Sequence, residues 1–154
     1  MPIGWRIDRA HRAASAFSGE GARIYGGRWN SRGFRVAYLG EHQSLSVLEV
    51  FVNNQPLSTA ADYVIVSAEW DAGLMETVQL RELPPDWRRS PPGAKTAAVG
   101  DRWLRAARSA VLAVPSAIIP TEKNFLLNPA HPSFRRIRLG KPVPFEFDPR
   151  MLQR

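Results

Sequence analysis

The chain has 154 residues, which suits one domain with a single hydrophobic core. No apolar run approaches the ~18 residues that a membrane-spanning helix needs, and the first residues lack the apolar segment of a signal peptide. The sequence contains no cysteine, so disulfides, thiolate metal sites and cysteine nucleophiles are excluded. These features favour a cytoplasmic protein.

The formal net charge of +7 indicates an anionic partner. The basic residues are spread as singles and pairs, such as Arg88–Arg89 and Arg135–Arg136. Dedicated nucleic-acid binders more often carry a dense basic stripe or tail. The charge alone therefore leaves three partners open: a nucleic acid, a phosphorylated small molecule and an acidic protein.

The predicted elements follow one another irregularly. Apolar spacing predicts helices over 8–17, from near Ser44 to 53–56, and over 97–109 with Thr96 as its cap. β-Branched and apolar clusters predict strands at 34–39, 62–70, 76–80, 111–114 with 117–119, and 135–139. Glycine, proline and polar residues predict loops at 18–33, 84–95 and 120–134.

This order lacks the regular alternation of strand and helix that builds a parallel sheet. It favours an α+β fold in which helices flank a mainly antiparallel sheet. No repeat or domain boundary is visible, so we expect one domain over 1–154 with its core at about 5–139.

The loop before the first predicted strand contains a candidate phosphate-binding arginine. Arg28 follows Gly26–Gly27, and glycines let the backbone approach a ligand closely. The planar guanidinium group suits phosphate oxygens. The alternative is a tight turn with a solvated arginine.

An aromatic ring and a carboxylate follow within the next two elements. Tyr38 ends a predicted strand and is either a core residue or a ring that stacks on a flat ligand. Glu49 lies in a helix that is apolar nearly all round. A carboxylate there costs free energy unless it is paired or used. The alternative for Glu49 is an exposed position on the narrow polar side of the helix, beside Ser46.

Two further polar residues have weaker local support. Ser116 lies between two apolar strand halves, where it either caps a bulge or points into a pocket. His131 stands between prolines and is a possible base. The three histidines show no metal-ligand spacing, and no nucleotide-binding glycine loop or hydrolase motif is present. We therefore expect no metal.

At these residues the sequence resembles the RES-domain family, the toxins of bacterial RES–Xre toxin–antitoxin pairs. The family's Arg, Glu and Ser match Arg28 in GGRWN, Glu49 in SLSVLEVF and Ser116 in VPSAII. Tyr38 in VAYLG and the closing NFLLNPAHPSF also match, so the similarity covers essentially the whole domain. The loop at 84–95 has no match.

The resemblance implies an ADP-ribosyltransferase-like fold with a split sheet, and NAD⁺ as substrate. It implies that Arg28 clamps the pyrophosphate, that Tyr38 stacks on nicotinamide and that Ser116 bonds the ribose or amide. It also implies that Glu49 either holds the ribose hydroxyls and stabilises positive charge or orients the attacking water or phosphate. Asn128 and His131 are further pocket candidates. The implied partner is an Xre-like helix-turn-helix antitoxin that covers the active site. The resemblance implies that the toxin contacts DNA only through this antitoxin.

Several outcomes stay open. The ADP-ribose acceptor is water, inorganic phosphate or a protein such as a phosphoribosyl-pyrophosphate synthetase. A phosphate acceptor needs its own site, for which Arg23, Arg32 and Arg35 are unranked candidates. A different class of function is RNA binding or cleavage with stacking on Trp29, Trp87 and Trp103. A third is a non-catalytic interaction domain, in which Glu49 is only structural.

Overall fold

The computed structural model describes residues 1–54, 57 and 61–152. Its strands are β1 (Ile3–Arg9), β2 (Ala37–Gly40), β3 (Tyr63–Glu69), β4 (Met75–Thr77), β5 (Val111–Pro115), β6 (Lys123–Leu127), β7 (Arg138–Leu139) and β8 (Val143–Phe145). Its α-helices are α1 (Glu20–Tyr25), α2 (Gln43–Asn53) and α3 (Ala94–Ala106). Short 3₁₀ helices are η1 (Ala10–Ser15), η2 (Ala72–Leu74), η3 (Leu80–Glu82), η4 (Pro132–Arg136) and η5 (Pro149–Met151).

The strands form one curled sheet in the order β4-β5-β6-β2-β1-β3-β7, and β8 also pairs with β3. The β4–β5 pair is parallel, and the other described pairs are antiparallel. The predicted α+β class with a mainly antiparallel sheet is therefore confirmed. None of the helices in the described part of the chain is both long and apolar enough to cross a membrane.

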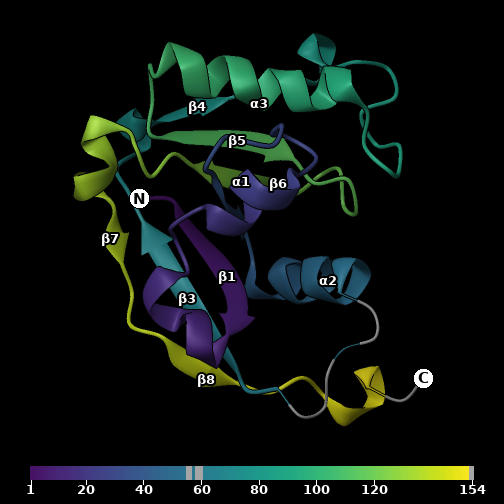
Figure 1. The fold of residues 1–154 in the computed structure, drawn as a ribbon, viewed down its shortest axis with the longest axis vertical. Coiled ribbons are helices and arrows are strands. Elements are labelled where there is room, and N and C mark those ends of the chain that lie inside the picture. Colours follow the sequence, from purple (N-terminus) through teal and green to yellow (C-terminus); the bar gives the residue numbers. More distant parts are fainter. Residues whose placement is uncertain (55–56, 58–60, 153–154) are drawn as a thin grey trace.

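Helices cover different parts of this sheet (Figure 1). α3 runs along the β4–β5 end and packs through Val99 and Trp103 against a cluster that includes Leu112 and Leu126. α2 lies beside β1 and β2, where Val47 and Val50 join a second cluster. The opposite face of β5 and β6 carries a third cluster, which contains Trp70, Phe125 and Leu127.

The C-terminal segment is part of the packed domain. Phe145 and Phe147 make an edge-to-face contact at 5.2 Å between ring centroids, and Phe147 makes another with Tyr63 at 4.9 Å. Met151 and Leu152 pack against the same cluster. Hydrophobic packing thus continues beyond 139, where the sequence-based core was expected to end.

The helix predicted over 8–17 exists only as the 3₁₀ helix η1 at 10–15, because Asp8 and Arg9 belong to β1 and residues 16–17 form a turn. β1 pairs along its whole length with β3, and this long-range pairing outweighs the weak helical spacing at 8–9. The loop predicted over 18–33 contains the short helix α1.

The predicted loop over 120–134 was also wrong in part, because it contains β6, a central strand paired on both sides. Residues 117–119 form bends, not a strand. Of the strand predicted over 135–139, Arg135 and Arg136 belong to η4, and only Arg138–Leu139 form the strand β7. Short strands such as these show little periodicity of their own.

The other predicted elements exist with shifted ends. β2, β3 and β4 overlap the strands predicted at 34–39, 62–70 and 76–80. α2 has His42 at its N-cap, not Ser44, and α3 has Gly93 there, not Thr96, which is buried. α2 ends at Asn53 as predicted, although residues 55 and 56 lie outside the described residues.

Candidate functional site

The GGRWN motif forms a tight turn before β2. Gly26 has a φ of +74°, a left-handed conformation that favours glycine. Gly27 and Asn30 pair across the turn, and a side chain at Gly27 would bring its Cβ within 2.7 Å of the Tyr38 hydroxyl. Gly26 therefore provides the left-handed backbone conformation, and Gly27 makes room for the Tyr38 hydroxyl. The turn presents Arg28 at its tip.

Tyr38 anchors this turn through its hydroxyl group. The hydroxyl donates to Asn30 Oδ1 at 2.5 Å and accepts from the Trp29 amide at 3.2 Å. Burial raises the pKa of the Tyr38 hydroxyl far above its ordinary value, so the group stays a donor. The amide of Asn30 in turn donates to the carbonyls of Ala22 and Phe34. Tyr38 thus fixes the shape of the turn, and only its ring remains for a ligand.

The helix α3 supports the turn from the other side. A Cβ on Gly100 would lie 1.7 Å from the Trp29 carbonyl oxygen, so only glycine permits this approach. The adjacent Asp101 is buried and accepts hydrogen bonds from the Ser31 amide at 2.8 Å and the Ser31 hydroxyl at 2.5 Å. Arg28 therefore projects from a turn that is fixed at both ends.

Arg28 is half-buried and is held by backbone carbonyls. Its Nη1 donates to the carbonyl oxygens of Trp87 and Arg89, at 2.8 Å each. Those two bonds use both Nη1 hydrogens, and none of the hydrogen bonds among the described residues uses Nε or Nη2. Burial lowers the pKa of Arg28, and the negative charge of Glu49 opposes that shift. The Nε–Nη2 edge is the pair of donors that can bind two oxygens of a phosphate.

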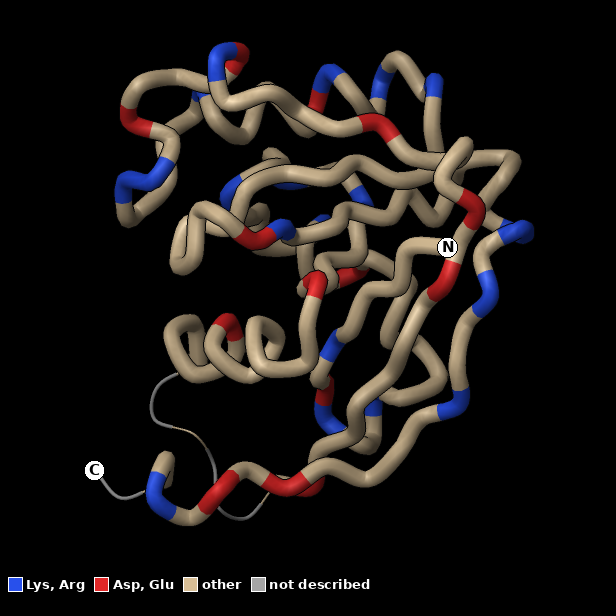
Figure 2. The backbone as a smooth tube through the Cα atoms, turned by 180° about the vertical axis from the view of Figure 1, so that it is seen from behind, with Lys and Arg blue, Asp and Glu red and all other residues tan. Residues whose placement is uncertain are grey.

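Glu49 is the only charged residue of α2, visible as the red band on this otherwise tan helix in Figure 2. It is partly buried and accepts a hydrogen bond from Ser116 Oγ at 3.3 Å. Burial raises the pKa of Glu49, and hydrogen bonds from Asn124 and Ser116 and the charge of Arg28 oppose the rise. Three elements thus meet at one carboxylate: α2, the end of β5 and the start of β6.

Ser116 is fully buried and organises the residues after β5. Its hydroxyl oxygen accepts from the amides of Ile118 and Ile119, at 3.1 Å each, and its hydrogen is directed to Glu49. The sequence left two roles open for Ser116, capping a bulge and pointing into a pocket. Its hydroxyl does both, because it accepts from two amides of the following loop and donates to Glu49. Ser116 positions Glu49 and shapes the loop beside it.

Asn128 and His131 lie apart from this group. Asn124 and Asn128 stand at opposite ends of β6, so roughly 13 Å of strand separates them. Asn128 Oδ1 accepts from the Ala130 amide. His131 Nε2 donates to the Ala107 carbonyl at 2.8 Å, and its Nδ1 accepts from the Ser133 amide. The structure therefore unites Arg28, Tyr38, Glu49 and Ser116, and leaves the other two at the α3–β5 connection.

Sequence reasoning missed several residues that build the site. Asn30 and Asn124 stand inside the motifs GGRWN and NFLLN, so their motif positions were a usable signal. Asp101 and Gly100 lie in an ordinary helical stretch, and no local pattern marks them. The described residues contain no group of three or more His, Asp and Glu side chains arranged to hold a metal ion.

The fold and this site define a class of protein: a small α+β domain in which a partly buried glutamate interacts electrostatically with an arginine held on a glycine turn. Residues 3–148 match the RES domain family, and the chain belongs to that family. It is 38% identical to "Toxin Res" of Yersinia enterocolitica over 96% of this chain and 97% of the relative. It is 34% identical to "Prs ADP-ribosylating toxin" of a Sphingobium species, over 97% and 96% respectively.

A second "Toxin Res", from Photorhabdus laumondii, is 34% identical over 97% of this chain and 96% of its own length. The resemblance noted in the sequence is therefore confirmed at the level of the family, and the toxin class comes with it. The site residues named above were chosen on motif and geometry, and their roles are taken up as proposals.

Proposed function

We propose that this protein is the toxin of a toxin–antitoxin pair and consumes NAD⁺ by cleaving the bond between nicotinamide and ribose. The observation that carries the proposal is the environment of Glu49: a partly buried carboxylate that accepts a hydrogen bond from Ser116 and whose pKa is influenced by Asn124 and by the charge of Arg28. Such a carboxylate can stabilise a cationic sugar, and an arginine edge can hold the pyrophosphate.

In the proposed reaction the C1′–N bond breaks, and its electron pair passes to the cationic nicotinamide ring, which leaves as a neutral molecule. The sugar passes through an oxocarbenium-like state, as in glycoside hydrolysis. Glu49 lies against this positive charge and orients the attacking water. The water proton passes through the carboxylate to solvent, so the products are ADP-ribose, nicotinamide and one proton.

Tyr38 and Ser116 assist in this proposal mainly by positioning. Because the Tyr38 hydroxyl is bound within the turn, its ring is the part left to stack on nicotinamide. Ser116 directs its hydrogen to Glu49 and can exchange that partner for a ribose hydroxyl. Asn128 and His131 remain candidate pocket residues only if the cofactor extends to the far end of β6.

The acceptor decides between hydrolysis, phosphorolysis and transfer to a protein. The name of the Sphingobium relative supports the protein-transfer alternative. The RNA alternative gains no support, because Trp29 and Trp103 are buried and Trp87 packs on Trp29 at 6.1 Å between ring centroids. Bases stack on exposed rings.

We also propose an antitoxin partner with an Xre-like helix-turn-helix domain, which binds DNA in the toxin–antitoxin complex. An acidic face on that partner would complement the net charge of +7 of the toxin. The proposed setting is the bacterial cytoplasm, where NAD⁺ is available. Co-purification with the product of the neighbouring gene would support this pairing, and no binding in a pull-down would contradict it.

The test is to incubate antitoxin-free protein with NAD⁺, with and without inorganic phosphate, and to identify products by NMR. We expect NAD⁺ loss with release of nicotinamide. ADP-ribose identifies a hydrolase, and ADP-ribose 1″-phosphate identifies a phosphorylase. Intact NAD⁺ in both samples, with labelling of a protein in lysate, favours the transferase. Intact NAD⁺ with no labelled protein would overturn the proposal.

A further inference from the structure

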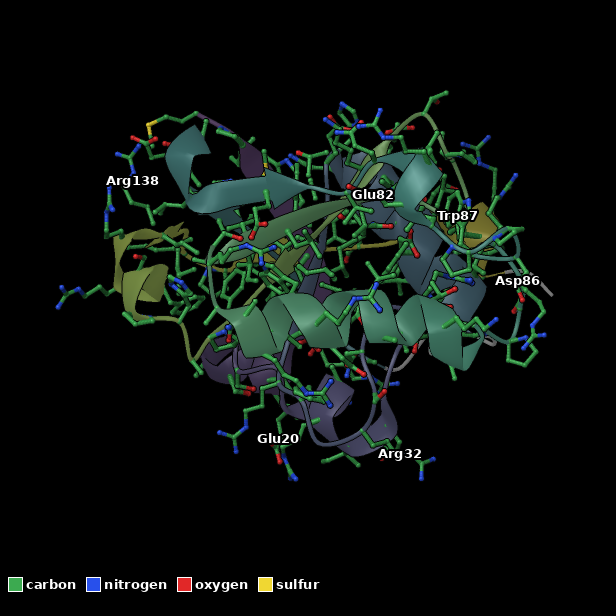
Figure 3. The ribbon with its side chains drawn as sticks, turned by 90° about the horizontal axis from the view of Figure 1, so that it is seen from above. Glu20, Arg32, Glu82, Asp86, Trp87 and Arg138 are labelled. Atoms are coloured by element: carbon green, nitrogen blue, oxygen red, sulfur yellow. The ribbon has the colours of Figure 1, made fainter. Side chains whose placement is uncertain are left out.

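The loop that precedes α3 is fixed against the Arg28 turn, and it lies within the residues that match the RES family. The carbonyls of Trp87 and Arg89 both accept from Arg28 Nη1, and the ring of Trp87 packs on Trp29. Figure 3 shows Trp87 further in than Asp86, which lies at the periphery. The residue between the two carbonyl groups is Arg88.

The side chain of Arg88 leads to the other half of the site. Its Nε donates to the Ala117 carbonyl at 3.0 Å. Ala117 directly follows Ser116, whose hydroxyl bonds Glu49. Arg88 is exposed, and no hydrogen bond or ion pair among the described residues uses its two Nη groups. The guanidinium is therefore held in place at one nitrogen and is free at the others.

Arg28 is bound by the carbonyls on both sides of Arg88, and Arg88 is bound to the residue after Ser116, so both guanidinium groups border the same site. The positive charge of Arg88 adds to burial in lowering the pKa of Arg28, and the negative charge of Glu49 opposes that shift. Like charges repel, so a pair of arginines held only by carbonyl groups is suited to an anion that binds between them.

The arginines considered from the sequence are less suitable. Arg23 and Arg35 both bind the carboxylate of Glu20 on α1. Arg32 extends away from the body of the molecule on the side of Glu20 (Figure 3). None of these three reaches Arg28 or Glu49 through an interaction among the described residues.

We infer that Arg88 is a second phosphate-binding residue of this site and that it acts with the free Nε–Nη2 edge of Arg28. The ligand chemistry is a phosphate group, either the pyrophosphate of NAD⁺ or a free phosphate that attacks the ribose. The inference deepens the proposed function and rests on it only for the identity of the natural ligand.

The test is calorimetric titration of the whole chain with ADP-ribose and with inorganic phosphate. Arg88→Gln should weaken binding of at least one of them about tenfold, and Arg88→Lys should restore part of it. The matched control is Arg102→Gln, which removes the same charge from the exposed side of α3 and should stay within about twofold of the wild type.

The two titrations separate the sources of the phosphate. Competition between phosphate and ADP-ribose, with both weakened by Arg88→Gln, assigns the pair to the pyrophosphate. Phosphate that binds together with ADP-ribose, and is lost in Arg88→Gln, assigns it to the attacking anion. Equal affinities in Arg88→Gln and Arg102→Gln would overturn the inference, as would a wild-type protein that binds neither ligand.

The proposed function can fail separately. Wild-type loss of NAD⁺ with unchanged binding by Arg88→Gln rejects the role of Arg88 and leaves the reaction standing. Phosphate-ligand binding that depends on Arg88, without any NAD⁺ loss or protein labelling, retains the anion site and rejects the reaction.

Discussion

An asparagine stands near each end of β6, and the two asparagines have different roles. At one end Ser116 donates to Glu49, and Asn124, which also donates to the Leu39 carbonyl, opposes the rise in the pKa of that carboxylate. At the other end Asn128 and His131 bind the backbone between α3 and β5. Both asparagines stand in the motif NFLLNPAHPSF, so the motif alone does not separate them.

The two ends of β6 differ in the groups to which their side chains bind. His131 uses both ring nitrogens on backbone groups, and Asn128 Oδ1 is bound to a backbone amide. These two side chains therefore satisfy the hydrogen-bonding groups of the backbone. At the Glu49 end the partner is a carboxylate whose burial raises its pKa and therefore costs free energy. A group kept at such a cost is a candidate for function.

Glu49→Gln should have the largest effect on activity. Loss of the negative charge removes the stabilisation of the cationic sugar, so we expect NAD⁺ turnover to fall by about 10³-fold or more. The change is nearly isosteric, so the fold should persist, as judged by circular dichroism. Turnover like that of the wild type would contradict the role of Glu49.

Ser116→Ala should have the next largest effect, because it removes the donor to Glu49 and the acceptor for two amides. We expect turnover to fall by about tenfold and the free energy of unfolding to fall by about 1–3 kcal/mol, since buried amides lose their partner. Urea unfolding and steady-state kinetics measure the two effects. A variant of unchanged stability would contradict the contribution assigned to these hydrogen bonds.

The pH dependence should follow the Glu49 carboxylate. Because its folded pKa is raised, we expect activity to be lost as pH falls through a midpoint above the usual range for glutamate. Between the unfolded and folded pKa values the folded state binds more protons, so the contribution of Glu49 to stability declines as pH rises. Glu49→Gln should therefore unfold at an equal or higher temperature than the wild type at neutral pH.

His131→Ala should have the smallest effect on activity and a clear effect on stability. It removes the bond to the Ala107 carbonyl and the cap of η4, which together contribute about 1–2 kcal/mol. We expect kcat within about twofold of the wild type. A large loss of kcat at unchanged stability would show that His131 belongs to the active site, and would contradict the separation of the two ends of β6.

The sequence allowed the site to be named but not assembled. Arg28, Glu49 and Ser116 were found from motifs and from the cost of burying polar groups, and the structure brings them together. The purpose of each glycine in GGRWN could not be read locally, because Gly27 is required by Tyr38 and Asn30 across the turn. Gly100 is similar, since its partner is the Trp29 carbonyl of a distant segment.

The sequence by itself determined the family, the α+β class and the main candidate residues, because motif order and apolar patterning are properties of the chain. Only the tertiary structure decided that β1 and β6 are strands, because their stability comes from pairing with partners far along the chain. It also decided that Asn128 and His131 lie away from Glu49, and that the backbone carbonyls on either side of Arg88 bind Arg28. Distances between side chains depend on how the sheet curls and where loops attach, and no local pattern encodes them.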